Sequence, residues 1–126
     1  MDKEKLVKKI NGIYQECRKP NWDNQNALAI SEDTYKHGLR FLNKLEKYNI
    51  STDNLTISPL TDDNLSFGWA YPDNTTFNID FDRSTDCLLW CCFKDDKHFW
   101  EGSCPHFEDI VKNLQLFINY HEKKQS

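Results

Sequence analysis

The stretch that decides the fold spans residues 65–82 and has the sequence LSFGWAYPDNTTFNIDFD. Large apolar residues occupy every second position from 65 to 71, and again from 77 to 81. A period of two is typical of strands that bury one face. Between the two runs, Pro72-Asp73-Asn74 favours a turn. This segment therefore predicts an antiparallel hairpin with one buried face.

The second strand of this hairpin shows the alternation most strictly. We expect Phe77, Ile79 and Phe81 to face a hydrophobic core, because successive side chains of a strand point to opposite faces. The polar residues between and after them are then expected to face outward. These are Asn78, Asp80 and Asp82.

Further strands are predicted on both sides of the hairpin. Leu55 and Ile57 precede it, an apolar run from 86 to 93 follows it, and Asp95-Asp96 then favours a turn into His98-Phe99-Trp100. We predict an antiparallel meander of three to five strands over about residues 54–100. Residues 101–104 are expected to form a loop.

Three amphipathic helices are predicted around the meander. Apolar residues recur at helical spacing over about 2–17, 31–48 and 105–121. Asp2 and Ser31 are plausible N-caps, and Gly38 lies on the apolar side of the second helix, where it allows close packing. The expected fold is a single α+β domain over 1–126, with two N-terminal helices and a C-terminal helix packed on one face of the sheet.

Composition restricts the class of protein. The chain has 126 residues, 13% of them aromatic, which favours one folded domain over disorder. No apolar run has the length of about 20 residues that a membrane span needs. The first residues lack the apolar stretch of a secretion signal. We therefore expect a cytoplasmic protein, in which five cysteines are poor material for a disulfide framework.

Charge is segregated along the chain. The net charge is +3 over residues 1–52, −9 over 53–109 and +2 over 110–126. The acidic segment coincides with the predicted strands, and a field of this kind attracts and steers a basic partner. An ordinary solvated face, which also discourages aggregation, explains the acidity equally well. The acidic residues expected in turns are Asp62, Asp63, Asp73, Asp86, Asp95 and Asp96.

A motif lies between the first two helices. Asn21-Trp22-Asp23-Asn24, followed by Ala27, resembles the pattern N-W-D-G-x-x-A of a family of small bacterial and phage-borne proteins. The resemblance continues with Pro59, an Asp63-Asn64 turn and a strand that reaches Trp69, and it covers roughly residues 21–82. It implies a fold unit carried on accessory or mobile DNA, and no particular reaction.

Two positions depart from that family's pattern. Asn24 and Asn64 stand where the family has glycine. Asn is the residue that best replaces glycine at positive φ, so the turns are expected to survive. Trp22 and Asp23 could grip a ligand, but we favour a structural role, in which Trp22 fills a gap and Asp23 binds the loop backbone.

Cysteine and histidine residues near the C-terminal end raise two chemical alternatives. Adjacent Cys91 and Cys92 point to opposite faces of a strand, so the spacing matches no zinc knuckle. Cys104 precedes a predicted helix, where a thiolate is favoured, and His98 or His106 could act as its base. A small zinc- or thiol-dependent enzyme that uses these three residues remains an alternative.

The function expected from these observations is non-catalytic protein binding. We expect a neutraliser or inhibitor of a larger protein with a basic surface, such as an antitoxin-like or phage anti-defence (anti-CRISPR-like) protein. A sequence pI of about 5.5 opposes direct nucleic-acid binding. No cofactor and no membrane are expected. Monomer and homodimer both remain open, since exposed Trp90 or Trp100 could line a self-association face.

Overall fold

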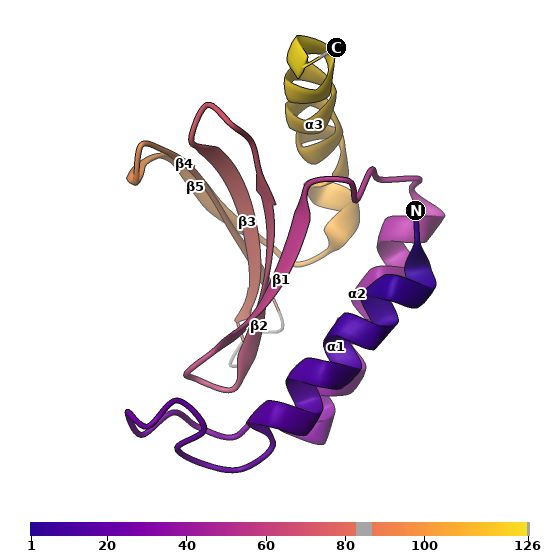
Figure 1. Cartoon of the computed structure of the whole chain (residues 1–126). Helices are drawn as coiled ribbons and strands as arrows, with labels where there is room; N and C mark the ends of the chain where they lie inside the picture. The colour runs from indigo at the N-terminus through magenta and orange to yellow at the C-terminus, as the bar shows by residue number, and fades with distance from the viewer. Residues whose placement is uncertain (83–86, 126) are drawn as a thin grey trace.

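The computed structural model describes residues 1–82 and 87–125 (Figure 1). It confirms the α+β fold with two N-terminal helices, an antiparallel sheet and a C-terminal helix. The elements are α1 (Lys3–Cys17), α2 (Glu32–Lys47), β1 (Leu55–Leu60), β2 (Asn64–Ala70), β3 (Thr75–Asp82), β4 (Cys87–Lys94), β5 (Lys97–Cys104), a 3-10 turn η1 (Phe107–Asp109) and α3 (Val111–Gln125). None of the helices in the described residues has the length and apolar run that crossing a bilayer requires.

The five strands form one sheet in the order β1-β2-β3-β4-β5, and every neighbouring pair is antiparallel. Phe67 is paired with Ile79, and Ile79 with Trp90, so these three side chains share one face. We call this the inner face. Figure 1 shows the three helices on one side of the sheet, with the opposite side bare. That opposite side is the outer face.

The core lies between the inner face and the helices. Phe41 of α2 places its ring 4.6 Å from the ring of Phe67 and 5.2 Å from that of Phe107. Trp69 and Phe77 are completely buried, as their alternation predicts. Aromatic side chains of this size bury large apolar areas, so this cluster contributes strongly to the hydrophobic stabilisation of the fold.

The two N-terminal helices begin at the predicted caps. The Asp2 carboxylate accepts from the backbone N–H of Lys5, and the Ser31 hydroxyl oxygen accepts from that of Thr34. A Cβ atom at Gly38 would lie 2.7 Å from Cδ1 of Leu65. Glycine at this position therefore lets α2 approach β2 closely, as predicted.

The C-terminal helix contacts the strands through two residues one turn apart, Phe117 and His121. Phe117 contacts Phe77 on β3, with ring centroids 5.3 Å apart. His121 stacks on Tyr71 at 4.6 Å, and its Nε2 lies 3.5 Å from the carboxylate of Asp73 in the β2–β3 turn. Helix α3 is thus tied to the strands through aromatic contacts and the approach of His121 to the Asp73 carboxylate.

The chain between residues 101 and 111 differs from the prediction. Residues 101–104 were expected in a loop, but β5 continues to Cys104, which pairs with Leu88. Polar and exposed residues dominate this edge strand, so it lacks the apolar alternation by which strands are recognised. The final helix was expected from 105, but η1 and Ile110 intervene and α3 begins at Val111.

Tight turns rely on Asn and Asp throughout the described residues. All residues with positive φ there are Asn or Asp, and no glycine has positive φ. Asn24, at a glycine position of the motif, has φ 61°, which confirms that Asn serves that turn. At the second position the left-handed residue is Asp63, with φ 60°, and Asn64 is the first residue of β2.

Candidate functional site

The outer face of the sheet is the first candidate site. Its charged positions on the described strands are Asp80 and Asp82 on β3 and Glu101 and His98 on β5, with no Lys or Arg among them. The register brings Glu101 opposite Cys91, which lies opposite Asn78. The carboxylates thus spread from the third strand to the fifth. This arrangement gives the helix-free side of the molecule a negative field.

Asp80 lies at the centre of this face in an unfavourable environment for a carboxylate. Burial raises its pKa, a hydrogen bond from Ser66 opposes that shift, and the nearby Asp62 carboxylate raises the pKa further. Its Oδ1 atom is shielded from solvent and makes no hydrogen bond within the described structure. An orphaned carboxylate oxygen of this kind gains free energy when a cationic donor reaches it.

Two shallow hollows adjoin Asp80 on this face. One, of about 290 Å³, lies toward β1 and is lined by Leu60, Asp62 and Asp82 among others. The other, of about 540 Å³, lies toward β5 and is lined by Cys91 and Glu101 among others. Leu89, which is 40% exposed, borders both hollows. Each hollow therefore combines carboxylates with apolar surface, a combination that suits the stem and the head of a Lys or Arg side chain.

The other acidic residues from the sequence prediction do not all lie on this face. Asp62 lies at the β1–β2 turn and borders the smaller hollow. The Asp63 carboxylate accepts from the backbone N–H of Ser31, 2.7 Å away, so it is directed at the N-terminus of α2. Asp63 therefore serves the helix rather than the outer face.

Three more acidic residues lie at the far end of the sheet. Asp95 and Asp96 form the exposed β4–β5 turn, and the Asp95 carboxylate accepts from the side-chain amide of Asn74. Asp73 faces His121 of α3. Asp86 lies outside the described residues. The structure thus groups Asp62, Asp80 and Asp82 and separates them from Asp95 and Asp96.

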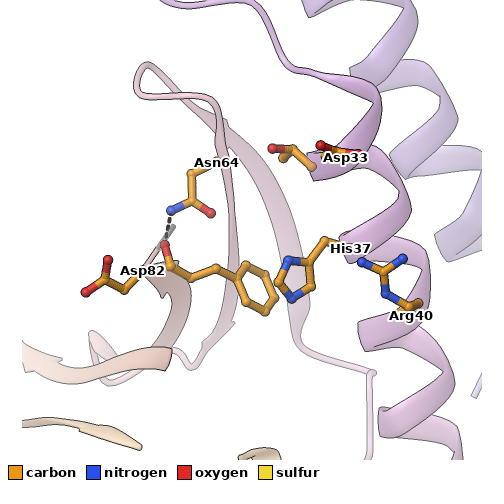
Figure 2. Close-up of a pocket in the computed structure, with 7 residues that line it drawn as sticks. Asp33, His37, Arg40, Asn64 and Asp82 are labelled. Carbon is orange, nitrogen blue, oxygen red and sulfur yellow. Dashed lines mark hydrogen bonds between the residues drawn. The ribbon is translucent and has the colours of Figure 1, made fainter. Parts of the chain in front are cut away.

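A second candidate is a cleft of about 420 Å³ between α2 and the ends of β2 and β3. Figure 2 shows His37 and Arg40 projecting from α2, while Asn64 and Asp82 come from the strands. The His37 ring lies 4.2 Å from the ring of Phe81. Asp33 lines the same cleft.

The buried polar residue of this cleft, Asn64, bonds to the backbone of the protein itself. Asn64 is buried, donates to the backbone carbonyl of Phe81 at 2.5 Å and accepts from the backbone N–H of Leu65. Figure 2 shows the Asp82 carboxylate pointing away from His37. The lining opposes two carboxylates to an imidazole and a guanidinium. A lining that brings the carboxylates of Asp33 and Asp82 together with the guanidinium of Arg40 points to no single sign of charge in a ligand.

The motif loop between α1 and α2 is closed by its own side chains. The Trp22 indole N–H donates to the carbonyl of Leu28 at 2.8 Å. The Asp23 carboxylate accepts from the backbone N–H groups of Gln25 and Ala27, and Asn21 accepts from that of Asn26. These bonds are those of a self-contained turn, with Asp23 as the central acceptor.

Of the residues in the alternative chemistry, His98 lies near the opposite end of β5 from Cys104 and His106. Cys91 is on the outer face and Cys92 on the inner face, and burial raises the pKa of Cys92 to about 12. Burial, followed by Asp109 and Cys87, raises the pKa of the Cys104 thiol, which opposes thiolate formation. His106 is exposed beside it. No three metal-ligating side chains converge in the part of the chain that the structure describes.

Sequence reasoning missed two contributors to the outer face. Glu101 was expected in a loop, and Leu89 belonged to a continuous apolar run without an assigned direction. The polar spacing of Glu101 and Ser103 on either side of Gly102 was an available, weak signal for a strand. The His37 cleft was also missed, because it depends on helix α2 meeting β3.

Comparisons with known proteins return no match: no family model, no curated protein and no solved structure resembles the chain significantly. The side chains of the site are therefore the observations that bear on function.

Proposed function

We propose that the protein is a non-catalytic binding module that uses the outer face of its sheet to hold a protein partner with a basic surface. One observation carries the proposal. The helix-free face combines Asp80, Asp82 and Glu101 with exposed apolar surface and has no Lys or Arg on its described strand positions. A surface of this composition steers and fixes a cationic partner.

The environment of Asp80 supports this role. An ionised carboxylate with a shielded, unpaired oxygen is unfavourable in the free protein. A Lys or Arg side chain from a partner would supply the missing donor and compensate the burial. The hollows beside Leu89 give such a side chain room to enter.

The biological consequence that we propose is inhibition. Enzymes that act on nucleic acids carry basic clefts, since phosphate neutralisation dominates their affinity. A small acidic face that docks in such a cleft blocks it without any chemistry of its own. The likeness of the motif loop to proteins of accessory genomes supports a neutraliser of the antitoxin or anti-defence type.

The test compares three forms of the protein as bait in its host lysate. The wild type is compared with the double variant Asp80→Lys/Asp82→Lys, and with Glu4→Lys/Glu16→Lys, which changes charge equally on the exposed face of α1. We expect a stoichiometric partner that is retained by the wild type and the α1 variant, lost by the outer-face variant, and released by salt. The affinity is then measured with the purified partner.

Two outcomes would contradict the proposal. The first is equal retention of the partner by the outer-face variant, with its fold verified by circular dichroism and thermal unfolding. The second is an affinity that is the same at low and at high salt, because attraction between an acidic face and a basic partner weakens as salt screens the exposed charges.

A further inference from the structure

Strand β5 is an exposed edge of the sheet. It ends the strand order, and all its residues from Lys97 to Ser103 are exposed. Phe99 is 60% and Trp100 41% exposed. An edge strand presents backbone N–H and C=O groups that can pair with another chain.

The opposite edge of the sheet is less suited to pairing. Strand β1 contains Pro59, which has no N–H to donate, and it packs against α1. The two edges therefore differ in backbone donors and in accessibility. Of the two edge strands, β5 is the one in which no outward-directed N–H group is lost to proline.

The pairing of β5 with β4 is irregular near the β4–β5 turn and regular further along the strand. A bulge interrupts its pairing with β4 between Cys92 and Phe93, next to the turn. From Trp100 to Cys104 the register against β4 is unbroken. Bulges and a charged residue such as Lys97 protect edges from pairing, so the protected part ends near Phe99. Five consecutive residues remain, and those among them whose N–H and C=O groups point away from β4 can pair with a neighbouring strand.

The two faces of this five-residue edge differ in character. On the outer face, Glu101 continues the acidic surface that begins at Asp80. On the inner face, Trp100 lies 4.4 Å from Trp90 between ring centroids. The Trp90 ring also covers Gly102, where a Cβ atom would lie 2.6 Å from it. A strand placed beside β5 meets a carboxylate on one side and indole rings on the other.

We propose that the partner binds by adding an extended strand to β5, antiparallel to it, with Lys or Arg toward Glu101 and apolar residues toward Trp100. The proposal rests on the proposed function and specifies how the partner is held. Main-chain bonds then supply affinity, and alternating side chains supply specificity. The added strand would extend the sheet and bring its basic side chains onto the acidic outer face.

Charge decides between this occupant and a second copy of the chain. Antiparallel pairing of β5 with itself across Gly102 would bring Glu101 of each copy close to that of the other across the strand boundary. It would also join two acidic faces into one. A basic strand has neither disadvantage.

The experiment uses two peptides as probes. The first is an N-acetylated, C-amidated seven-residue peptide that alternates Val and Lys. The second has the same side chains, but alternate backbone nitrogens are methylated on the edge that would pair, which removes its donors and keeps its charge. Binding is followed by calorimetry and by amide hydrogen exchange of β5.

We expect the first peptide to bind at least tenfold more tightly than the methylated one and to slow exchange at the outward-directed amides within Trp100–Cys104. Equal binding of both peptides, with no added protection of β5, would overturn strand addition and leave charge-driven binding to the outer face intact. No binding of either peptide would count against both proposals.

Two protein variants distinguish a local contact with Glu101 on β5 from long-range attraction by the net charge of the protein. Glu101→Lys should weaken the first peptide at least fivefold, whereas Glu16→Lys on α1 should leave its affinity within twofold. Equal weakening by both variants would show long-range attraction alone and would also overturn the strand-addition geometry. A shift to a dimer in light scattering without peptide would favour the second copy instead.

Discussion

The inner and outer faces of the sheet are made by the same strands, yet they are stabilised in different ways. On β3, residues alternate strictly between buried and half-buried positions. Phe77 and Ile79 on the inner face are fully buried, whereas Asn78 and Asp80 on the outer face keep part of their exposure. The inner face gains stability from apolar burial, and the outer face places charge where burial penalises it. One face therefore builds the fold, and the other is available for binding.

The largest expected effect is loss of a ring from the inner face. Phe67→Ala removes a completely buried side chain that contacts Phe41 and Phe81. We expect the free energy of unfolding to fall by about 3–5 kcal/mol, because the cavity cannot fully collapse. Urea denaturation monitored by circular dichroism measures this change. Thr56→Ala, exposed on the outer face of β1, should change stability by less than about 0.5 kcal/mol.

Two glycines extend the comparison to the helices. Gly38→Ala places a Cβ 2.7 Å from Leu65, whereas Gly12→Ala on α1 meets nothing within 4 Å. Overpacking costs about 1–3 kcal/mol, less about 1 kcal/mol gained in helix propensity, so Gly38→Ala should destabilise the fold by about 1 kcal/mol. Gly12→Ala should stabilise it by about 0.5–1 kcal/mol. An equal stabilisation of the protein by both substitutions would contradict the close approach of α2 to β2.

The inner face was also the easier one to predict from sequence. Phe77, Ile79 and Phe81 showed their direction directly, because size and polarity alternate with the period of a strand. The helix starts at Asp2 and Ser31 could also be predicted, because an N-cap depends only on nearby side chains. Strand β5 was predicted only in part, because an exposed edge needs no apolar alternation.

The site was less predictable because it depends on which turns share an end of the sheet. Asp62 and Asp95 look alike in sequence, yet strand order places them at opposite ends. Asp63 and Asp62 are adjacent, but positive φ at Asp63 directs its carboxylate to Ser31. The environment of Asp80 depends on residues from other strands, such as Leu89 of β4 and Ser66 of β2. None of these properties is encoded in a local pattern.

The charged contact that holds α3 offers a smaller test. Burial raises the pKa of Asp73, but hydrogen bonds from Thr75 and the nearby His121 outweigh it, so the net shift is downward. A depressed carboxyl pKa contributes stability above the unfolded value of about 4, and this contribution is lost as the pH falls through the folded pKa. Asp73→Asn should therefore destabilise the protein at pH 6 by less than about 1 kcal/mol, given its solvent contact.

The pH dependence distinguishes this link from a simple packing loss. The stability difference between the wild type and Asp73→Asn, measured by urea unfolding, should shrink as the pH is lowered from 5 to 3. A constant difference over that range would show that the carboxylate charge makes no contribution.

The smallest expected change in stability comes from removing the charge of Asp80. Its direction distinguishes a binding role of this carboxylate from a structural one. Because burial raises the pKa of Asp80, the folded state takes up its proton more readily than the unfolded chain. Ionisation of Asp80 therefore costs stability at pH 7, and the cost is relieved as the pH falls toward 4. Asp80→Asn keeps the shape without the charge, and should stabilise the protein by roughly 0.5 kcal/mol at pH 7 after allowance for its remaining solvent contact.

The same substitution should weaken partner binding, since it removes the charge that a cationic side chain would meet. Opposite signs for stability and binding are what a residue placed for function produces, because such residues trade stability for recognition. Thermal unfolding and affinity measured on Asp80→Asn, beside the outer-face control Thr56→Ala, test both signs together. A loss of stability in Asp80→Asn would instead make the carboxylate a structural partner of Ser66, and the outer face would then lose its strongest claim to a binding role.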